Sequence, residues 1–134
     1  MKRSEVLRPL SHDHYEGLQL AARLRRARRA GEDPAGWAET VGAFWRDHLV
    51  PHFAEEEALV IPVLLAGAPP LAERIRAEHR AIEALVAAVE AERADWNGRL
   101  GDVADVLTAH IRFEERGAFP AAERLLEDAP GEDR

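Results

Sequence analysis

The sequence predicts an all-α fold, an up-down-up-down antiparallel four-helix bundle formed by one domain over residues 1–134. Ala, Leu, Glu and Arg, which favour helices, dominate the chain, and no stretch shows the period-two alternation of β-branched residues that a strand needs. Three short stretches rich in Gly and Pro, residues 31–36, 67–70 and 97–101, divide the chain into four segments. Connections this short favour antiparallel neighbours.

The four predicted helices span residues 9–30, 37–66, 71–96 and 102–127. Pro51 lies within the second helix, and we expect a kink or local break there because proline lacks the backbone N–H that a helix requires. The tail from about residue 128 carries Pro130 and Gly131 and is expected to fray.

The composition limits which binding partners and which metal-ligand atoms are expected. Eighteen Lys and Arg residues against 25 Asp and Glu give a formal charge of -7, which argues against nucleic acid or an anionic membrane as a partner. Because the chain has no cysteine, any metal must be held by nitrogen and oxygen atoms. No apolar run has transmembrane length and the first residues are charged, so we expect a cytoplasmic protein, monomeric or homodimeric.

Each predicted helix places one histidine on its apolar stripe when residues are spaced at about 100°. One such histidine is usually an ordinary core residue, but four of them with two glutamates favour a metal site, because burying unpaired carboxylates is costly. The stripes are Leu10, His14, Leu18 and Ala21; Trp45, Leu49, His52, Glu56, Leu59, Val60 and Val63; Ile75, His79, Ile82, Val86 and Val89; and Val103, Leu107, His110, Glu114, Ala118 and Ala121.

The second and fourth helices repeat one pattern. His52 and His110 are each followed by glutamates four and five residues later and by a proline ten residues later. The first and third helices match at Asp13-His14 and Glu78-His79. The repeat predicts two related helix pairs across a pseudo-two-fold axis, a symmetry that suits a pair of metal ions.

The order of one histidine, HxxxE, one histidine and HxxxE resembles the hemerythrin-like HHE cation-binding family, from Leu10 to Pro120. The resemblance implies two iron ions, oxo- or hydroxo-bridged, although zinc or manganese also suits such ligands. It implies that the four histidines are terminal ligands and that the two glutamates are bridges. The implied metal ligands are His14, His52, Glu56, His79, His110 and Glu114.

The sequence departs from the oxygen-carrying hemerythrins at two places. Glu83 stands where they have a second histidine on the third helix, and Glu114 follows its histidine by four residues rather than five. These departures weaken the expectation that the protein simply carries O2 reversibly. The resemblance implies a non-haem di-iron protein that binds or processes O2, peroxide or NO, with catalase-like peroxide disproportionation as one candidate activity.

Two alternatives stay open. The first is a non-enzymatic iron-, oxygen- or redox-sensing module that acts through a partner surface. The second is a bundle whose polar stripe is satisfied by water and mutual hydrogen bonds without a metal. A shift in stability or oligomeric state on metal loading without turnover would mark the sensing module. Stabilisation by leucine at His52 and His110 would mark the metal-free bundle.

For several polar residues the sequence allows two roles. Glu83 is either a further ligand or, as we favour, a solvated acid. His48 is either an alternative ligand or, as we favour, an outer contact or helix cap, and His12 is expected to be exposed. Asp13 and Glu78 could orient an imidazole from outside, but a surface role is favoured for both.

Overall fold

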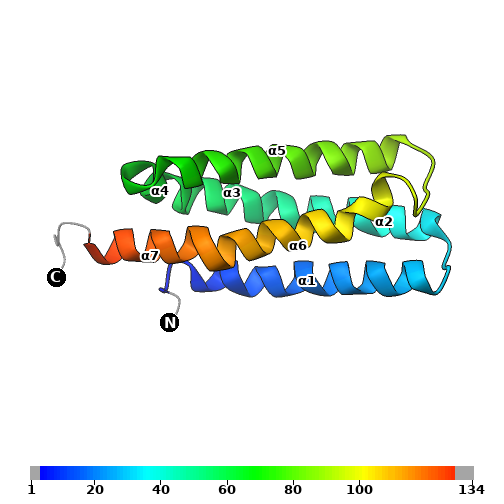
Figure 1. The fold of residues 1–134 in the computed structure, drawn as a ribbon, viewed down its shortest axis with the longest axis horizontal. Helices are drawn as coiled ribbons and strands as arrows, with labels where there is room; N and C mark the ends of the chain where they lie inside the picture. Colours follow the sequence, from blue (N-terminus) through cyan, green and yellow to red (C-terminus); the bar gives the residue numbers. More distant parts are fainter. Residues whose placement is uncertain (1–3, 129–134) are drawn as a thin grey trace.

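The computed structural model describes residues 4–128, which form four long helical rods in an antiparallel, up-down-up-down bundle (Figure 1). The all-α prediction is confirmed, and the described residues include no strand. The fraying predicted beyond residue 128 lies outside this range. The rods are α1 (Arg8–Arg29); α2 (Pro34–Phe44), η1 (Trp45–Leu49), α3 (Val50–Leu59) and α4 (Ile61–Gly67); α5 (Pro69–Ala91); and η2 (Arg99–Asp102), α6 (Val103–Phe113), η3 (Glu114–Ala118) and α7 (Phe119–Asp128).

Helix ends follow local capping chemistry. Gly31 adopts a φ of 69°, a left-handed conformation that suits glycine, just after α1. The Asp33 side chain then accepts a hydrogen bond of 3.0 Å from the N–H of Ala35. This cap, followed by Pro34 in the first helical turn, starts α2 three residues before the predicted position.

The third rod is shorter than predicted. Helix α5 ends at Ala91, because Glu92 is extended with a ψ of 163°. Beyond it, the N–H of Asn97 bonds to the Asp95 side chain at 2.9 Å, a local turn that competes with helix. The predicted helix therefore extended five residues too far, since its wheel pattern took no account of these turn-forming side chains.

Three interruptions in the second and fourth rods each lie just before a proline. The π-helical turn η1 ends two residues before Pro51, where a break was predicted. The π-helical turn η3 ends two residues before Pro120, and the second rod is interrupted again at Val60, two residues before Pro62. A proline removes one intrahelical hydrogen bond and crowds the preceding turn, so a wider turn lets the rod continue.

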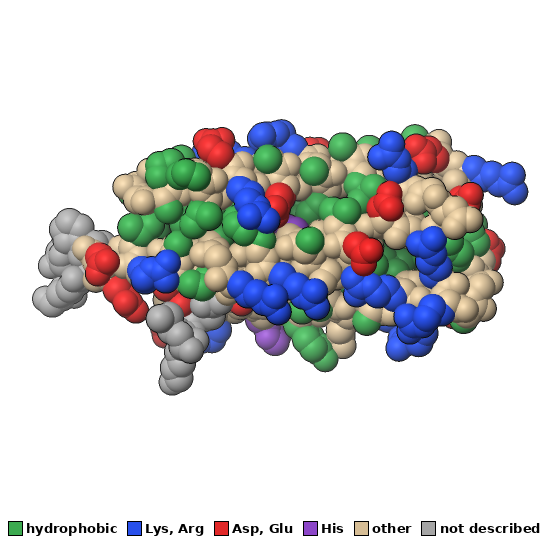
Figure 2. Space-filling model, in the orientation of Figure 1, with side chains coloured by type: hydrophobic (Ala, Val, Ile, Leu, Met, Phe, Trp, Pro, Cys, Tyr) green, Lys and Arg blue, Asp and Glu red, His purple; other side chains and the backbone are tan. Residues whose placement is uncertain are grey.

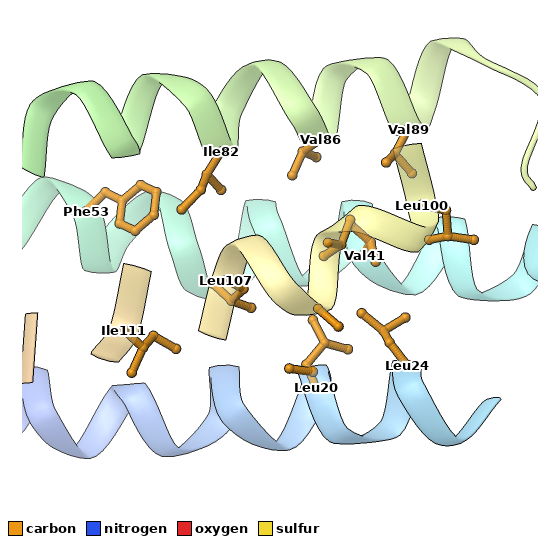
Figure 3. Close-up of a cluster of buried hydrophobic side chains, with 13 residues drawn as sticks. Leu20, Leu24, Val41, Phe53, Ile82, Val86, Val89, Leu100, Leu107 and Ile111 are labelled. Atoms are coloured by element: carbon orange, nitrogen blue, oxygen red, sulfur yellow. The ribbon is translucent and has the colours of Figure 1, made fainter. Parts of the chain in front are cut away.

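Two apolar clusters fill the bundle, one toward each end. The α2-end cluster, shown in Figure 3, holds Leu20, Ala21, Leu24, Val41, Phe53, Ile82, Val86, Val89, Leu100, Val103, Ala104, Leu107 and Ile111. The α4-end cluster holds Leu7, Leu10, Val60, Ile61, Leu64, Ala72, Ile75, Ala118, Phe119, Ala121 and Ala122. Burial of these side chains stabilises the fold by about 25 cal/mol for each Å² of apolar surface removed from water.

Two residues of the predicted stripes face solvent instead. Leu18 and Leu59 are 39% and 44% exposed. On α1 the inward positions are taken by Gly17 and Leu20. Leu59 immediately precedes the interruption at Val60, which changes the phase of the helix. A helical wheel does not include such a change, because it assumes one constant angle per residue.

The outer surface is strongly charged. In Figure 2 basic side chains gather over α1 and α6 on the visible face. Of the arginines between residues 23 and 29, Arg25 reaches across to Asp105 at 2.8 Å, so the cluster is not wholly a solvated face. No helix within residues 4–128 is long and apolar enough to cross a membrane.

Candidate metal centre

A layer of buried polar side chains separates the two apolar clusters. The backbone of all four rods brings these side chains to one place, as the helical wheels predicted. Each is at most 5% exposed, and both glutamates are completely buried. The layer contains His14 from α1, His52 and Glu56 from α3, His79 from α5, His110 from α6, and Glu114 at the start of η3.

The six residues form two groups of possible ligands that share Glu56 and Glu114, called here the shared glutamates. In each group, one nitrogen or oxygen atom per residue lies within 4.8 Å of all the others. The first quartet is His14, His52, Glu56 and Glu114, and the second is Glu56, His79, His110 and Glu114. Two adjacent cations, joined by two carboxylates, fit this arrangement.

Four atoms in the layer lack a hydrogen-bond partner in the described part of the protein. They are Nε2 of His52 and His110 and Oε2 of both shared glutamates. His52 Nε2 lies 3.0 Å from Glu56 Oε2, and His110 Nε2 lies 3.3 Å from Glu114 Oε2, without hydrogen-bond alignment. Ligands bound to one cation at about 2.1 Å lie about 3 Å from each other. The residues therefore fit a pair of metal ions.

Each histidine in the layer is held from outside by a carboxylate on another helix. Because a carboxylate only accepts, Nδ1 of each imidazole carries the proton and Nε2 faces the centre. The Nδ1 atoms donate to Glu115 from His14 at 2.6 Å, to Asp13 from His52 at 3.1 Å, to Glu57 from His79 at 2.8 Å, and to Glu78 from His110 at 2.6 Å. These four acids are called the outer acids.

The outer acids correct two expectations. Asp13 and Glu78 were favoured as surface acids, but each contacts an imidazole, and on a different helix from its own. Adjacent residues on a helix point about 100° apart, so an acid beside one histidine reaches the next rod. Glu57 and Glu115 were missed, although each follows a shared glutamate in the internal repeat. That recurrence was the available signal.

The remaining polar candidates lie outside the two quartets. Glu83 is exposed. His48 is half-exposed, stacks on Phe44 with ring centroids 4.9 Å apart, and has its Nδ1 3.7 Å from Glu16 Oε1. His12 is exposed, as expected. None of these three residues belongs to either quartet.

The buried histidines and glutamates strongly shift each other's pKa values. Burial opposes protonation of His14, but hydrogen bonds to Glu114 and neighbouring acids raise its pKa to about 11. The same balance raises the pKa of His79 to about 10 and that of His110 to about 9, and it also raises the pKa of His52. Burial and mutual repulsion would raise the pKa of the shared glutamates, but the histidines hold it below 4.5. A cation must therefore displace protons.

A cavity of about 190 Å³ connects this layer with the surface between α1 and the η1–α3 segment. His14, His52 and His110 form its inner wall, together with Phe53 and Ile111. A water molecule occupies about 30 Å³ in the liquid, so the cavity has room for a very small ligand. It gives the first quartet a route to solvent.

A four-helix bundle with two histidine and glutamate quartets joined by shared carboxylates defines a carboxylate-bridged, cation-binding class of protein. The family model for the hemerythrin HHE cation binding domain matches residues 5–122. The chain belongs to this family. Searches of curated proteins and of solved structures found no match.

Proposed function

We propose that this chain is a non-haem di-iron protein that binds or processes a small oxidant, namely O2, peroxide or NO. The observation that carries the proposal is the pair of quartets joined by Glu56 and Glu114, with four buried atoms lacking hydrogen-bond partners. A buried carboxylate without a compensating charge is costly, and two adjacent cations would remove that cost. Membership of the family supports cation binding.

The ligand atoms are compatible with iron. Imidazole nitrogen and carboxylate oxygen suit iron, and also zinc and manganese, whereas soft metals prefer sulfur. The outer acids increase the basicity of the imidazoles and fix their orientation, which strengthens binding of a hard cation. Both quartets have two imidazoles and two shared carboxylates, so each cation would keep coordination positions for a further ligand.

The cavity supports a small oxidant as that ligand. Its inner wall combines His14 and His52 with apolar side chains, so a neutral molecule could reach the first quartet without meeting arginine or lysine among the described lining residues. Bound iron would supply the electron exchange by which one hydrogen peroxide is reduced to two waters while a second is oxidised to O2. The protein would orient the imidazoles through Glu115 and Asp13 and limit access by size.

Metal analysis and an absorption spectrum of protein purified without added metal test this proposal first. Wild type is expected to hold about two irons per chain with near-ultraviolet charge-transfer bands, as in other carboxylate-bridged bundles. Glu56→Ala and Glu114→Ala should each lose both irons, because each carboxylate belongs to both quartets. Glu83→Ala is the matched control, since Glu83 lies outside both quartets, and should keep them.

Absence of metal in wild type, persisting after anaerobic Fe(II) addition, would reject the proposal. If iron binds, turnover of peroxide and spectral shifts with O2 or NO separate the three ligands. Iron binding without any of these responses would reject the oxidant role.

A sensing module is the second candidate, and the outer acids favour it. Each outer acid joins an imidazole of one rod to a different rod, so cation loading would act on contacts between helices. Loading should then raise thermal stability and change the oligomeric state or the exposure of an outer face, without turnover. Equal oligomeric state and surface protection in loaded and metal-free protein would count against it.

A further inference from the structure

The cavity beside the first quartet has an acidic outer wall. Its lining residues include Asp13, Glu16, Asp47 and Glu55, together with His48, and no arginine or lysine is found among the described residues that line it. Arg46, the neighbour of Asp47, is turned away and pairs with Glu90 at 2.9 Å. The outer part of the cavity wall therefore presents four carboxylates, and the cationic groups that face them are imidazoles, which a binding cation deprotonates.

These groups are arranged from solvent to interior. Glu16 and His48 have half-exposed side chains, the Asp13 side chain is 43% exposed, and His52 is buried at the inner wall. His52 Nε2 is buried and lacks a hydrogen-bond partner, while its Nδ1 is held by Asp13. The acidic wall thus leads from the surface to an unsatisfied metal-ligand atom.

The other surface depression near the layer has a different charge. It lies between α3 and α5 beside His79, and its lining includes Arg76 and Arg80 as well as Glu57 and Glu83. Two of its four formal charges are positive, so it offers a cation no comparable attraction. Phe53 also stacks on the His79 ring there, with centroids 3.8 Å apart, and covers one face of that ligand.

The π-helical turn helps to build the acidic wall. Asp47 and His48 lie within η1, the wide turn that precedes Pro51. Such a turn accommodates one more residue than an α-helical turn and changes the direction of the side chains it carries. In this structure it places Asp47 and His48 on the cavity that faces Glu16 of α1.

We propose that the acid-lined cavity is the route by which divalent cations load the metal centre, with Glu16, Asp47 and His48 forming its outer attracting group. The inference rests on the proposed function, because it requires the quartets to bind cations. A cleft lined by charges of one sign focuses the electric field and raises the local concentration of the opposite ion. Carboxylate and imidazole are also groups that a ferrous ion binds transiently as it sheds water.

Stopped-flow loading of Co(II), followed by its visible absorption, tests the route without requiring iron redox chemistry. The variant Glu16→Gln/Asp47→Asn removes two carboxylates from the wall and alters no quartet residue. Its loading rate at low ionic strength is expected to fall roughly five- to tenfold, at the low end of measured electrostatic steering. The rate should also depend less on salt than in wild type, because fewer charges attract the cation.

The control variant Glu39→Gln/Glu92→Gln makes the same change in net charge at exposed positions outside both cavities. It should load at the wild-type rate, and all three proteins should reach the same Co(II) content at equilibrium dialysis. Wild-type loading by the cavity variant, or equal slowing in the control, would overturn the route alone. Absence of bound Co(II) and Fe(II) in wild type at equilibrium would overturn the proposed function, and the route with it.

Discussion

The two halves of the candidate metal centre match in their inner histidines and glutamates and differ in their surroundings. The first half contains His14 and His52, the second contains His79 and His110, and both use the shared glutamates. His14 Nε2 lies 2.8 Å from Glu114, and His79 Nε2 lies 2.9 Å from Glu56. In these contacts the halves are nearly equivalent.

The outer acids of the two halves are not equivalent. Asp13 is 43% exposed and lies 3.1 Å from His52 Nδ1. Its counterpart Glu78 is 25% exposed, lies 2.6 Å from His110 Nδ1, and accepts a second hydrogen bond from Arg74 at 2.8 Å. The other pair differs in the opposite direction, because Glu115 of the first half is 30% exposed and 2.6 Å from His14 Nδ1, whereas Glu57 of the second half is 51% exposed and 2.8 Å from His79 Nδ1. The repeat therefore predicts the inward side chains, whereas the packing around them sets how firmly each imidazole is held.

Access also separates the halves. The acid-lined cavity reaches both histidines of the first half and His110 of the second, whereas the depression beside His79 is partly covered by the stacked ring of Phe53. We expect the first half to exchange its cation and ligands faster, because both of its histidines line the cavity. Four measurements test this comparison.

Removal of one imidazole should have the largest effect. His14→Ala and His79→Ala each damage one quartet, so each variant should retain one cation per chain where wild type binds two. In metal-free protein each change should lower the free energy of unfolding by roughly 3–5 kcal/mol, because it leaves buried carboxylates without their partner. Metal analysis and urea unfolding measure the two effects. His12→Ala, at an exposed position of α1, is the control.

Loss of both cations in either single variant would show that the halves cannot be filled separately. Retention of both would remove that histidine from the metal centre. A larger loss of stability in His14→Ala than in His79→Ala would be consistent with the higher pKa of His14.

The metal-free protein should lose stability as pH rises. The histidine pKa values are raised to about 9, 10 and 11 for His110, His79 and His14. Their contribution is fully present below the unfolded value of about 6.5 and is lost as pH rises through the folded values. The midpoint temperature of thermal unfolding should therefore fall between pH 6.5 and 11, with His110 releasing its proton before His79 and His14 in an NMR titration.

The shared glutamates, whose pKa values are lowered, act in the opposite direction. Their contribution is present above about 4.5 and is lost as pH falls further. Metal-free stability should thus be greatest between about pH 5 and 6.5. Cation affinity should instead rise with pH, because binding releases imidazole protons. A flat stability profile between pH 6.5 and 11 would contradict the buried ion pairs.

The outer acids should have a smaller and unequal effect. Losing such a partner typically weakens metal binding about 10- to 100-fold. Glu78→Gln should lie near the upper end of that range and Asp13→Asn near the lower end, because Glu78 is more buried and closer to its imidazole. Competition titration with a chelator measures both affinities. Equal losses would show that the packing difference has no effect on the cation.

Arg74→Ala should have the smallest effect. Arg74 Nε orients Glu78, and its guanidinium lies 3.8 Å from the centre of the Phe113 ring, so it acts on His110 only through that acid. Cation affinity should fall about two- to threefold, in keeping with a partly exposed ion pair. Arg74→Ala combined with Glu78→Gln should add nothing to Glu78→Gln alone. An added loss would assign Arg74 a separate role.

Much of the fold and of the inner centre follows from spacing along the chain. The Gly- and Pro-rich stretches separated four helices, and the 100° period placed His14, His52, His79 and His110 inward on their own rods. These features are local, because a helix fixes the direction of each side chain relative to its neighbours. Four inward histidines in antiparallel rods then meet at one level only if the rods are in register, which the repeat indicated.

Features that depend on two rods together could not be read from one helix at a time. The rotation and separation of neighbouring helices decide whether Asp13 contacts solvent or His52. They also decide whether Asp47 faces solvent or the cavity. The wide turns before Pro51 and Pro120 change that rotation, and a helical wheel with constant spacing does not include this change. Local sequence patterns thus predicted the helices and their inward histidines and glutamates. The outer acids and the acidic cavity depend on tertiary packing, because those contacts join residues whose relative positions no helical period specifies.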